Sequence, residues 1–186
     1  FLLGAGLTWL YDSAGFIGGA LFGALYAPIV ITGMHQTFIA IETQLLADFA
    51  TTGGTFIFPI AAMSNIAQGA ACLAVFVLMK DVKTRGIALP SGISALLGIT
   101  EPAMFGVNLR YRYPFIGAMI GAGTASAFIA FFNVKAQALG AAGLPGIISI
   151  KPNDLSMYVI GMLISFVVAF SVTIILGKRA QKKAAR

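Results

Sequence analysis

Two ionisable side chains lie in strongly apolar parts of the sequence, and their chemistry suits a polar ligand. Glu101 is one of only six acidic residues and has long apolar runs on both sides. His35 is the only histidine, and it follows Gly33, a residue type that lets a ligand or another backbone approach closely. A carboxylate accepts hydrogen bonds, whereas a neutral imidazole donates one and accepts one, so the pair suits sugar hydroxyls. Glu101 can also raise the basicity of a bound hydroxyl.

The surroundings of Glu101 predict a broken helix. An ionisable group at membrane depth is costly unless it faces protein or a water-filled cavity. Pro102 lacks an N–H and disfavours a helical Glu101, so the sequence predicts a helix that begins at Pro102. Glu101 would then lie beside unpaired backbone groups that bind polar ligands. A helix N-cap explains Glu101 equally well, and a buried histidine bonded to a backbone carbonyl is the simpler explanation of His35.

Further polar residues are candidates for supporting contacts to the same ligand, namely Thr100, Asn108 and Asn65. The amides of Asn65, Gln68 and Asn108 lie in apolar surroundings, where hydrogen bonding between helices is the commoner role. Cys72, the one cysteine, suits packing, and a single cysteine allows no disulfide and no zinc set within the chain. The chain has no P-loop, dinucleotide fingerprint or metal-ligand cluster. We therefore predict no cofactor and no metal, and any phosphoryl chemistry needs a partner.

The composition predicts an all-α membrane protein. The chain is 59% hydrophobic and 10% charged, whereas an ordinary soluble domain is about 25% charged. Regular strand alternation is missing, and the apolar content exceeds that of a barrel with a polar lumen. The net charge of +6 does not indicate nucleic acid, because many basic residues crowd the end of the chain: Lys178, Arg179, Lys182, Lys183 and Arg186. A basic tail after an apolar span predicts a cytoplasmic C-terminus next to the lipid bilayer.

Uncharged segments place the membrane spans. Residues 13–41 carry small side chains every fourth position, a spacing for close helix packing, at Gly15, Gly19, Gly23 and Ala27. Pro28 is predicted to interrupt this span. Residues 49–79 are too long for one straight crossing of about 20 residues, so we predict a turn at 51–55, a short bent segment and a helix over 62–79. Spans are also predicted over 115–132 and 155–177. Both of the last two are uncharged.

Shorter apolar segments predict a re-entrant hairpin. Residues 87–100 are too short to cross upright, and together with 101–109 they suit two half-helices that meet near the midplane. Residues 133–150 are glycine-rich and are predicted to be irregular or partly re-entrant. Residues 38–48 form an amphipathic segment whose acidic positions, Glu42 and Asp48, are predicted to mark an aqueous or cavity-facing side. The predicted fold is a polytopic helical bundle with broken helices and re-entrant hairpins.

Four stretches of the sequence resemble a known family. Residues 98–110, Gly-Ile-Thr-Glu-Pro-Ala-Met-Phe-Gly-Val-Asn-Leu-Arg, are similar to the signature of the glucose-superfamily sugar permeases of the bacterial phosphotransferase system. These permeases are the membrane (IIC) domain of enzyme II. Residues 32–38, Thr-Gly-Met-His-Gln-Thr-Phe, resemble the second family motif. Residues 58–69 and 141–150 most resemble the sucrose permeases, with trehalose and β-glucoside members next.

The resemblance implies a function and a site. Such permeases are membrane components of a phosphoenolpyruvate-dependent sugar phosphotransferase, in the bacterial inner membrane. They take up a disaccharide, here sucrose by preference, by group translocation. The family's conserved Glu and His, both associated with the sugar and its reacting hydroxyl, correspond to Glu101 and His35. The phosphoryl donor is a phosphocysteine of a IIB domain. The family forms homodimers with an elevator-like transport half, and residues 1–186 are expected to be that C-terminal half, without the N-terminal half and IIB.

Two other functions are compatible with the residues taken alone. In a proton-coupled secondary sugar transporter, Glu101 and His35 would relay protons, and broken helices with intramembrane carboxylates occur there too. The chemical state of the delivered sugar distinguishes this alternative from group translocation. A non-transporting membrane scaffold is the third possibility. The polar motifs within the spans argue against a scaffold.

Overall fold

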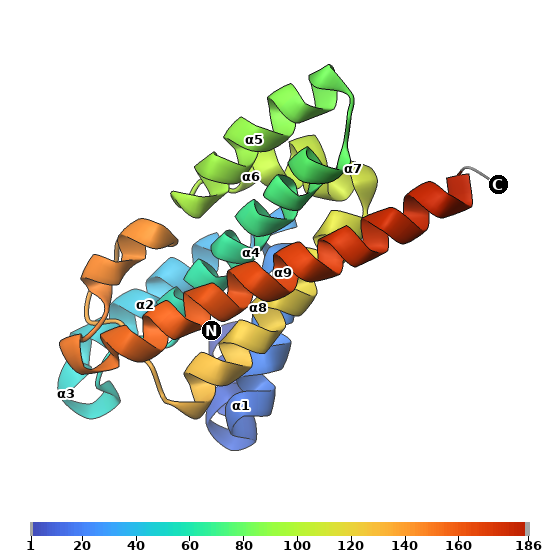
Figure 1. Ribbon diagram of the computed structural model, residues 1–186. Helices are drawn as coiled ribbons and strands as arrows, with labels where there is room; N and C mark the ends of the chain where they lie inside the picture. Colours follow the sequence, from blue (N-terminus) through green and yellow to red (C-terminus); the bar gives the residue numbers. More distant parts are fainter. Residues whose placement is uncertain (1, 185–186) are drawn as a thin grey trace.

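Long apolar helices make up most of the structure (Figure 1). The computed structural model describes the backbone of residues 2–184 and the side chains of residues 14–183. Within these ranges, four helices are long and apolar enough to cross a membrane: α1 (Leu2–Ile31), α4 (Ile57–Leu78), α8 (Tyr113–Phe131) and α9 (Leu155–Ala184). No strand accompanies them in residues 2–184 beyond isolated β-bridges. The chain is a multi-pass, all-α membrane protein, as the composition predicts.

Of the four long helices, α4 and α8 each contact the other three. Helix α8 lies between α1 and α9, and α4 packs against both α8 and α9 (Figure 1). Most of α4 is buried, because its sequence contains no charged residue and is rich in alanine. The main apolar core gathers around the first half of α4 and includes Ile57, Ile60, Met63 and Ile66. Helix α4 is therefore the element against which the other parts of the chain are positioned.

Small residues on α8 let two neighbours approach its backbone. Gly23 of α1 lies against Ser126, and an added Cβ at Gly121 would lie 2.5 Å from the Cβ of Ala169 in α9. The predicted small-residue packing is confirmed at these positions. Gly15 is different: it has φ 52° and ψ −123°, which breaks the helical conformation of α1, and no described atom lies within 4 Å of a Cβ placed there. Its prediction as a packing residue is wrong, since only glycine adopts that backbone conformation easily.

The close contact between α8 and α9 can be tested with one methyl group. Gly121→Ala is expected to destabilise the protein by about 1–3 kcal/mol, because the new Cβ collides with the backbone and side chain of Ala169. Gly86→Ala is the matched control, since a Cβ at Gly86 meets no atom within 4 Å. Thermal unfolding of the full-length protein in detergent measures both variants. Equal effects of the two would show that α8 and α9 do not touch closely.

Several helix boundaries differ from the sequence prediction. Helix α4 begins at Ile57 rather than at residue 62, because Pro59 lies in its first turn, where a missing N–H costs nothing. Pro28 does not interrupt α1, which continues to Ile31. Helix α9 runs beyond residue 177 to Ala184, since lysine, glutamine and alanine are good helix formers.

Short elements connect the long helices. Helix α2 (Gln36–Ala47) and helix α3 (Phe49–Thr52) follow α1, and the predicted turn comes at Gly53, which has φ 67°. The predicted irregular segment between α8 and α9 contains two 3₁₀ turns, η2 (Leu144–Ser149) and η3 (Pro152–Asp154). Isolated bridges join it to the start of α4, because Ala136 pairs with both Thr55 and Ile150. This segment is irregular, as predicted.

Candidate functional site

A helical hairpin carries the most unusual motif of the sequence. Its first arm is α5 (Val82–Leu96), and its second arm contains α6 (Glu101–Ala103), the π-helical turn η1 (Met104–Asn108) and α7 (Leu109–Tyr111). Both arms pack against α4 (Figure 1). At the open end of the hairpin the hydroxyls of Thr84 and Tyr111 lie 2.9 Å apart and join the arms. The two predicted half-helices are thus present as a hairpin.

Glu101 lies where the second arm begins. It is the first residue of α6 and is exposed, so the helix starts one residue earlier than predicted. Thr100, which is buried, takes the N-cap position, and its carbonyl accepts the first helical bond from the Met104 N–H at 2.8 Å. The N-cap explanation of Glu101 is therefore wrong. In the part of the chain whose side chains are described, no hydrogen bond or ion pair engages the Glu101 carboxylate.

The turn of the hairpin rests on the segment between α8 and α9. Gly98 has φ 105° and Gly143 has φ 131°, conformations that favour glycine, and an added Cβ at Gly143 would lie 3.1 Å from the Gly98 nitrogen. Asn65 of α4 donates to the carbonyl oxygen of Ala142 at 3.0 Å. Tyr158 of α9 donates to the carbonyl oxygen of Gly143 at 3.2 Å. Asn65 thus holds the segment that supports the turn next to Glu101, while its role toward a ligand stays a prediction.

Asn108 bonds the second arm to α4. It is fully buried, and its Nδ2 donates to the Gln68 side-chain oxygen at 2.7 Å and to the Gln68 carbonyl oxygen at 3.2 Å. The Cys72 thiol donates to Asn108 Oδ1 at 3.3 Å. This geometry is the interhelical bonding that the sequence leaves open as an alternative. A ligand contact of Asn108 remains a prediction. The buried Cys72 packs in α4, as predicted.

His35 lies in the turn that precedes α2. Its ring is half-buried, and its Nε2 lies 3.1 Å from the side-chain nitrogen of Gln36. With this amide orientation the Gln36 nitrogen donates, so Nε2 accepts and the proton of the neutral ring is on Nδ1. Nδ1 is buried, and no described residue accepts a hydrogen bond from it. The described part of the chain therefore contains no backbone carbonyl that bonds to His35 Nδ1, as the simpler explanation of this residue requires.

The structure does not join the two ionisable candidates directly. No hydrogen bond or ion pair among the described residues links Glu101 to His35. Both residues lie next to elements that contact α4. His35 directly precedes α2, Glu101 is the first residue of α6, and α2 and α6 each contact α4. Thr100 and Glu101 are adjacent, and Asn65 reaches their turn through Ala142. Thr100, Glu101 and Asn65 therefore lie around the hairpin turn, whereas Asn108 lies further along the second arm and His35 is a separate position.

Glu42 is a buried carboxyl group that the sequence prediction placed wrongly. It is 7% exposed, although the amphipathic pattern predicted an aqueous or cavity-facing position for it. Its Oε1 accepts a hydrogen bond from the Thr55 hydroxyl at 3.5 Å, and the backbone N–H of Phe58 at the start of α4 also bonds to it. Phe38 is the sequence signal for the burial of Glu42. This apolar residue lies four residues earlier on the same helix face and is buried as well. Glu42 thus connects α2 to α4.

Replacing Glu42 by glutamine should remove a pH dependence of stability. Burial raises the pKa of the Glu42 carboxyl from 4.5 to about 7, against the opposing hydrogen bonds from Thr55 and Phe58. The folded protein therefore holds this proton more tightly than the unfolded chain. The contribution of neutral Glu42 to the free energy of unfolding is fully present below about pH 4.5 and is lost as the pH rises through about 7. The expected loss is about 3 kcal/mol.

The measurement is thermal unfolding of the full-length protein at about pH 5 and about pH 8. Glu42→Gln should be stabilised relative to the wild type at the higher pH, because an amide has no proton to lose in this range. Asp48→Asn is the matched control, since Asp48 is an exposed carboxylate one residue beyond the end of α2. A wild-type pH dependence in Glu42→Gln would contradict the assignment.

Metal-binding chemistry has no donor set in the described residues. Nowhere in that part of the chain do three His, Cys, Asp or Glu side chains gather closely enough to hold a metal ion. The groups at the hairpin turn and at His35 are a carboxylate, a hydroxyl, amides and an imidazole. Such groups hydrogen-bond a polyhydroxyl ligand and can accept a proton from it.

Known proteins are similar to this chain in sequence. The family model described as "Phosphotransferase system, EIIC" matches residues 1–122. A Pasteurella multocida protein named "PTS system sucrose-specific EIIBC component" is 79% identical over 183 residues, which are 98% of this chain and 39% of that protein. A Vibrio alginolyticus protein with the same name is 71% identical over 177 residues, 95% of this chain and 37% of the relative.

A more distant relative carries the name of a different sugar. The Bacillus subtilis "PTS system trehalose-specific EIIBC component" is 49% identical over 172 residues, which are 92% of this chain and 36% of that protein. The chain thus spans well under half the length of these relatives. No solved structure matches the chain.

Proposed function

Because the chain belongs to the EIIC family of the phosphotransferase system, we propose that residues 1–186 are the C-terminal transport portion of a IIC membrane domain. The full protein takes up a sugar by group translocation, so that the sugar is phosphorylated as it enters the cell. The observation that carries this proposal is the exposed carboxylate of Glu101 at the turn of the hairpin. An ionisable group held in an apolar hairpin indicates a ligand site.

Glu101 is the proposed general base of the reaction. Its carboxylate accepts the proton of one sugar hydroxyl, and the hydroxyl oxygen then attacks the phosphorus of the donor. His35 donates from Nδ1 to a second sugar oxygen, which gives the buried Nδ1–H its missing acceptor. Thr100, Asn65 and Asn108 are proposed to support the sugar or the elements that hold it.

The phosphoryl donor is proposed to be a phosphocysteine on a IIB domain. In the transfer, an oxygen–phosphorus bond forms to the sugar and the sulfur–phosphorus bond breaks, which leaves a cysteine thiolate on IIB. The names of the relatives support this partner, because they are called EIIBC components. Cys72 does not suit the role, since its side chain is fully buried in α4.

Sucrose is the proposed substrate. The relatives at 79% and 71% identity are named sucrose-specific, whereas the trehalose-specific relative is 49% identical. Trehalose or a β-glucoside is the alternative disaccharide. Competition of each unlabelled sugar against labelled sucrose uptake ranks the three.

The protein is proposed to lie in the bacterial inner membrane as a homodimer with a cytoplasmic C-terminus. The basic residues at the end of α9 support this orientation, because positively charged ends stay on the cytoplasmic side. The sugar phosphate is then released on the side where the IIB domain works.

Transport by vesicles of known orientation tests the function. The full-length protein is supplied with labelled sucrose, with phosphoenolpyruvate and the soluble phosphoryl carriers either present or absent. Sucrose phosphate is expected only when the phosphoryl chain is complete. Free sucrose that accumulates with a proton gradient and ignores phosphoenolpyruvate would contradict the proposal and would favour proton-coupled transport.

A further inference from the structure

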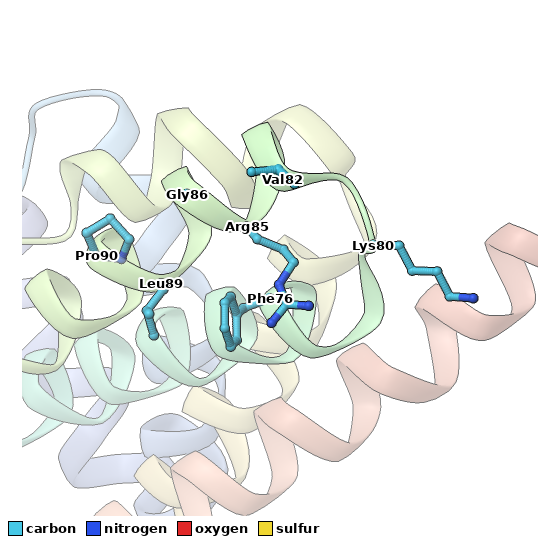
Figure 2. Close-up of a pocket in the computed structure, with 7 residues that line it drawn as sticks. All are labelled: Phe76, Lys80, Val82, Arg85, Gly86, Leu89 and Pro90. Carbon is cyan, nitrogen blue, oxygen red and sulfur yellow. The ribbon is translucent and has the colours of Figure 1, made fainter.

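A pocket lies between the end of α4 and the first half of α5, away from the hairpin turn that carries Glu101. Its volume is about 390 Å³, and it is lined by Phe76, Lys80, Val82, Arg85, Leu89 and Pro90, with Gly86 on its wall (Figure 2). The lining combines cationic and apolar side chains and contains no acidic one. We propose that this pocket binds the phosphate headgroup of an anionic phospholipid.

Arg85 supplies the cation that faces the pocket. Its guanidinium carbon lies 4.4 Å from the centre of the Phe76 ring, and Figure 2 shows the side chain reaching from α5 to that ring. Contact with an aromatic face orients the guanidinium and leaves its N–H groups free for an oxygen anion. Lys80 lies on the rim, where its ammonium group extends away from Phe76 (Figure 2). Arginine binds phosphate in a bidentate manner, so Arg85 is the principal phosphate ligand.

The local charge favours an anion. Asp81 is the acidic residue beside the pocket, and its carboxylate already accepts a hydrogen bond from the Thr84 N–H at 2.8 Å as the N-cap of α5. The basic end of α9 lies at the same end of the bundle, because the Gln181 side chain donates to the Leu78 carbonyl oxygen at 3.4 Å. Basic pockets between helices near the cytoplasmic surface are suited to anionic lipid headgroups.

The α5 backbone has a carbonyl oxygen without its helical donor at Gly86, a residue that lines the pocket. Pro90 has no N–H, so the carbonyl oxygen of Gly86 cannot receive its usual helical hydrogen bond from that residue. A headgroup that carries hydroxyl donors, such as phosphoglycerol, can therefore bond to it while its phosphate binds Arg85.

Apolar side chains continue from the pocket along α5 and favour a lipid over a free phosphate. Val82, Leu89 and Ile93 are spaced along one helix face and are 84%, 38% and 48% exposed. An acyl chain can lie along this face in the bilayer, whereas a soluble phosphate gains nothing from it. Phosphatidylglycerol joins all three features: an anionic phosphate, hydroxyl donors and acyl chains.

Native mass spectrometry of the full-length protein in detergent, titrated with phosphatidylglycerol, tests the proposal. Arg85→Gln removes the cation, and Gly86→Leu fills the pocket while both cations stay. A Cβ at Gly86 meets no atom within 4 Å, so the larger side chain is compatible with the fold. Each variant is expected to weaken binding of the first lipid about tenfold. Arg179→Gln, at the exposed end of α9, is the matched control and should bind like the wild type.

Two further ligands distinguish a lipid headgroup from a soluble phosphate as the occupant of the pocket. Phosphatidylethanolamine, a zwitterionic lipid, should bind the wild type and the variants alike, and glycerol 3-phosphate without lipid should not bind the pocket. Three results would overturn the proposal: wild-type binding by Gly86→Leu, an equal loss in Arg179→Gln, or binding of glycerol 3-phosphate that depends on Arg85. The second result indicates diffuse attraction by the basic surface, and the third indicates a soluble phosphate ligand.

Discussion

Glu101→Gln is expected to lower phosphoenolpyruvate-dependent phosphorylation of sucrose by about 10²–10⁴-fold. The amide keeps the size of the side chain but cannot take the hydroxyl proton. Sucrose binding should fall less, because the amide still accepts one hydrogen bond. Insertion in the membrane should be unchanged, since Glu101 is exposed and makes no structural bond among the described residues. The assay compares initial rates of sucrose phosphate formation at equal amounts of membrane protein.

The control for Glu101→Gln lies on the same hairpin. Asp81→Asn makes the same chemical change at the start of α5, where asparagine caps a helix as well as aspartate does. This variant should phosphorylate sucrose like the wild type. Glu101→Asp keeps the base but moves it by one methylene, so it should recover part of the lost rate. Wild-type turnover in Glu101→Gln would show that the carboxylate has no role in the reaction.

His35→Ala is expected to reduce phosphorylation by about 10²–10³-fold, with a large part of the loss in sugar affinity. The substitution removes the buried Nδ1–H donor, for which no described residue is an acceptor. His35→Asn places an amide nitrogen near the position of Nδ1 and should recover part of the affinity. The measurements are the dissociation constant for sucrose and the rate of sucrose phosphate formation.

A control for His35 is available on the helix that follows it. Thr43→Val removes a hydroxyl whose one hydrogen bond among the described residues goes to the Ile39 carbonyl oxygen of its own helix, at 2.7 Å. This variant should bind and phosphorylate sucrose like the wild type. Equal affinities of His35→Ala, His35→Asn and the wild type would place the imidazole outside the sugar site.

Local sequence patterns predicted the helices well because a membrane span depends on local composition. The 155–177 span, the small residues of α8 and the hairpin around Pro102 all follow from runs of uncharged residues and their interruptions. Errors arose where tertiary structure decides. Pro28 was predicted to interrupt a helix that in fact continues to Ile31, and Glu42 is buried against Thr55, which lies thirteen residues further along the chain.

For the candidate site, too, local sequence predicted the residue types, whereas tertiary structure determines their contacts. Residue types identified Glu101, His35 and the amides as groups able to bind a sugar. No pattern in one sequence reveals that Asn108 bonds to Gln68 across 40 residues, or that a π-helical turn directs it toward α4. Pairings between distant segments depend on how helices pack, which local spacing does not encode. The roles of these residues in transport stay predictions.

The glycine contacts of α8 have a mechanical consequence. Where backbones touch, as Gly121 does at Ala169, one helix cannot slide along the next without a steric collision. We expect α1, α8 and α9 to move as one rigid body. Relative displacement during a transport cycle then has to occur at joints outside the contacts of α8 with α1 and α9.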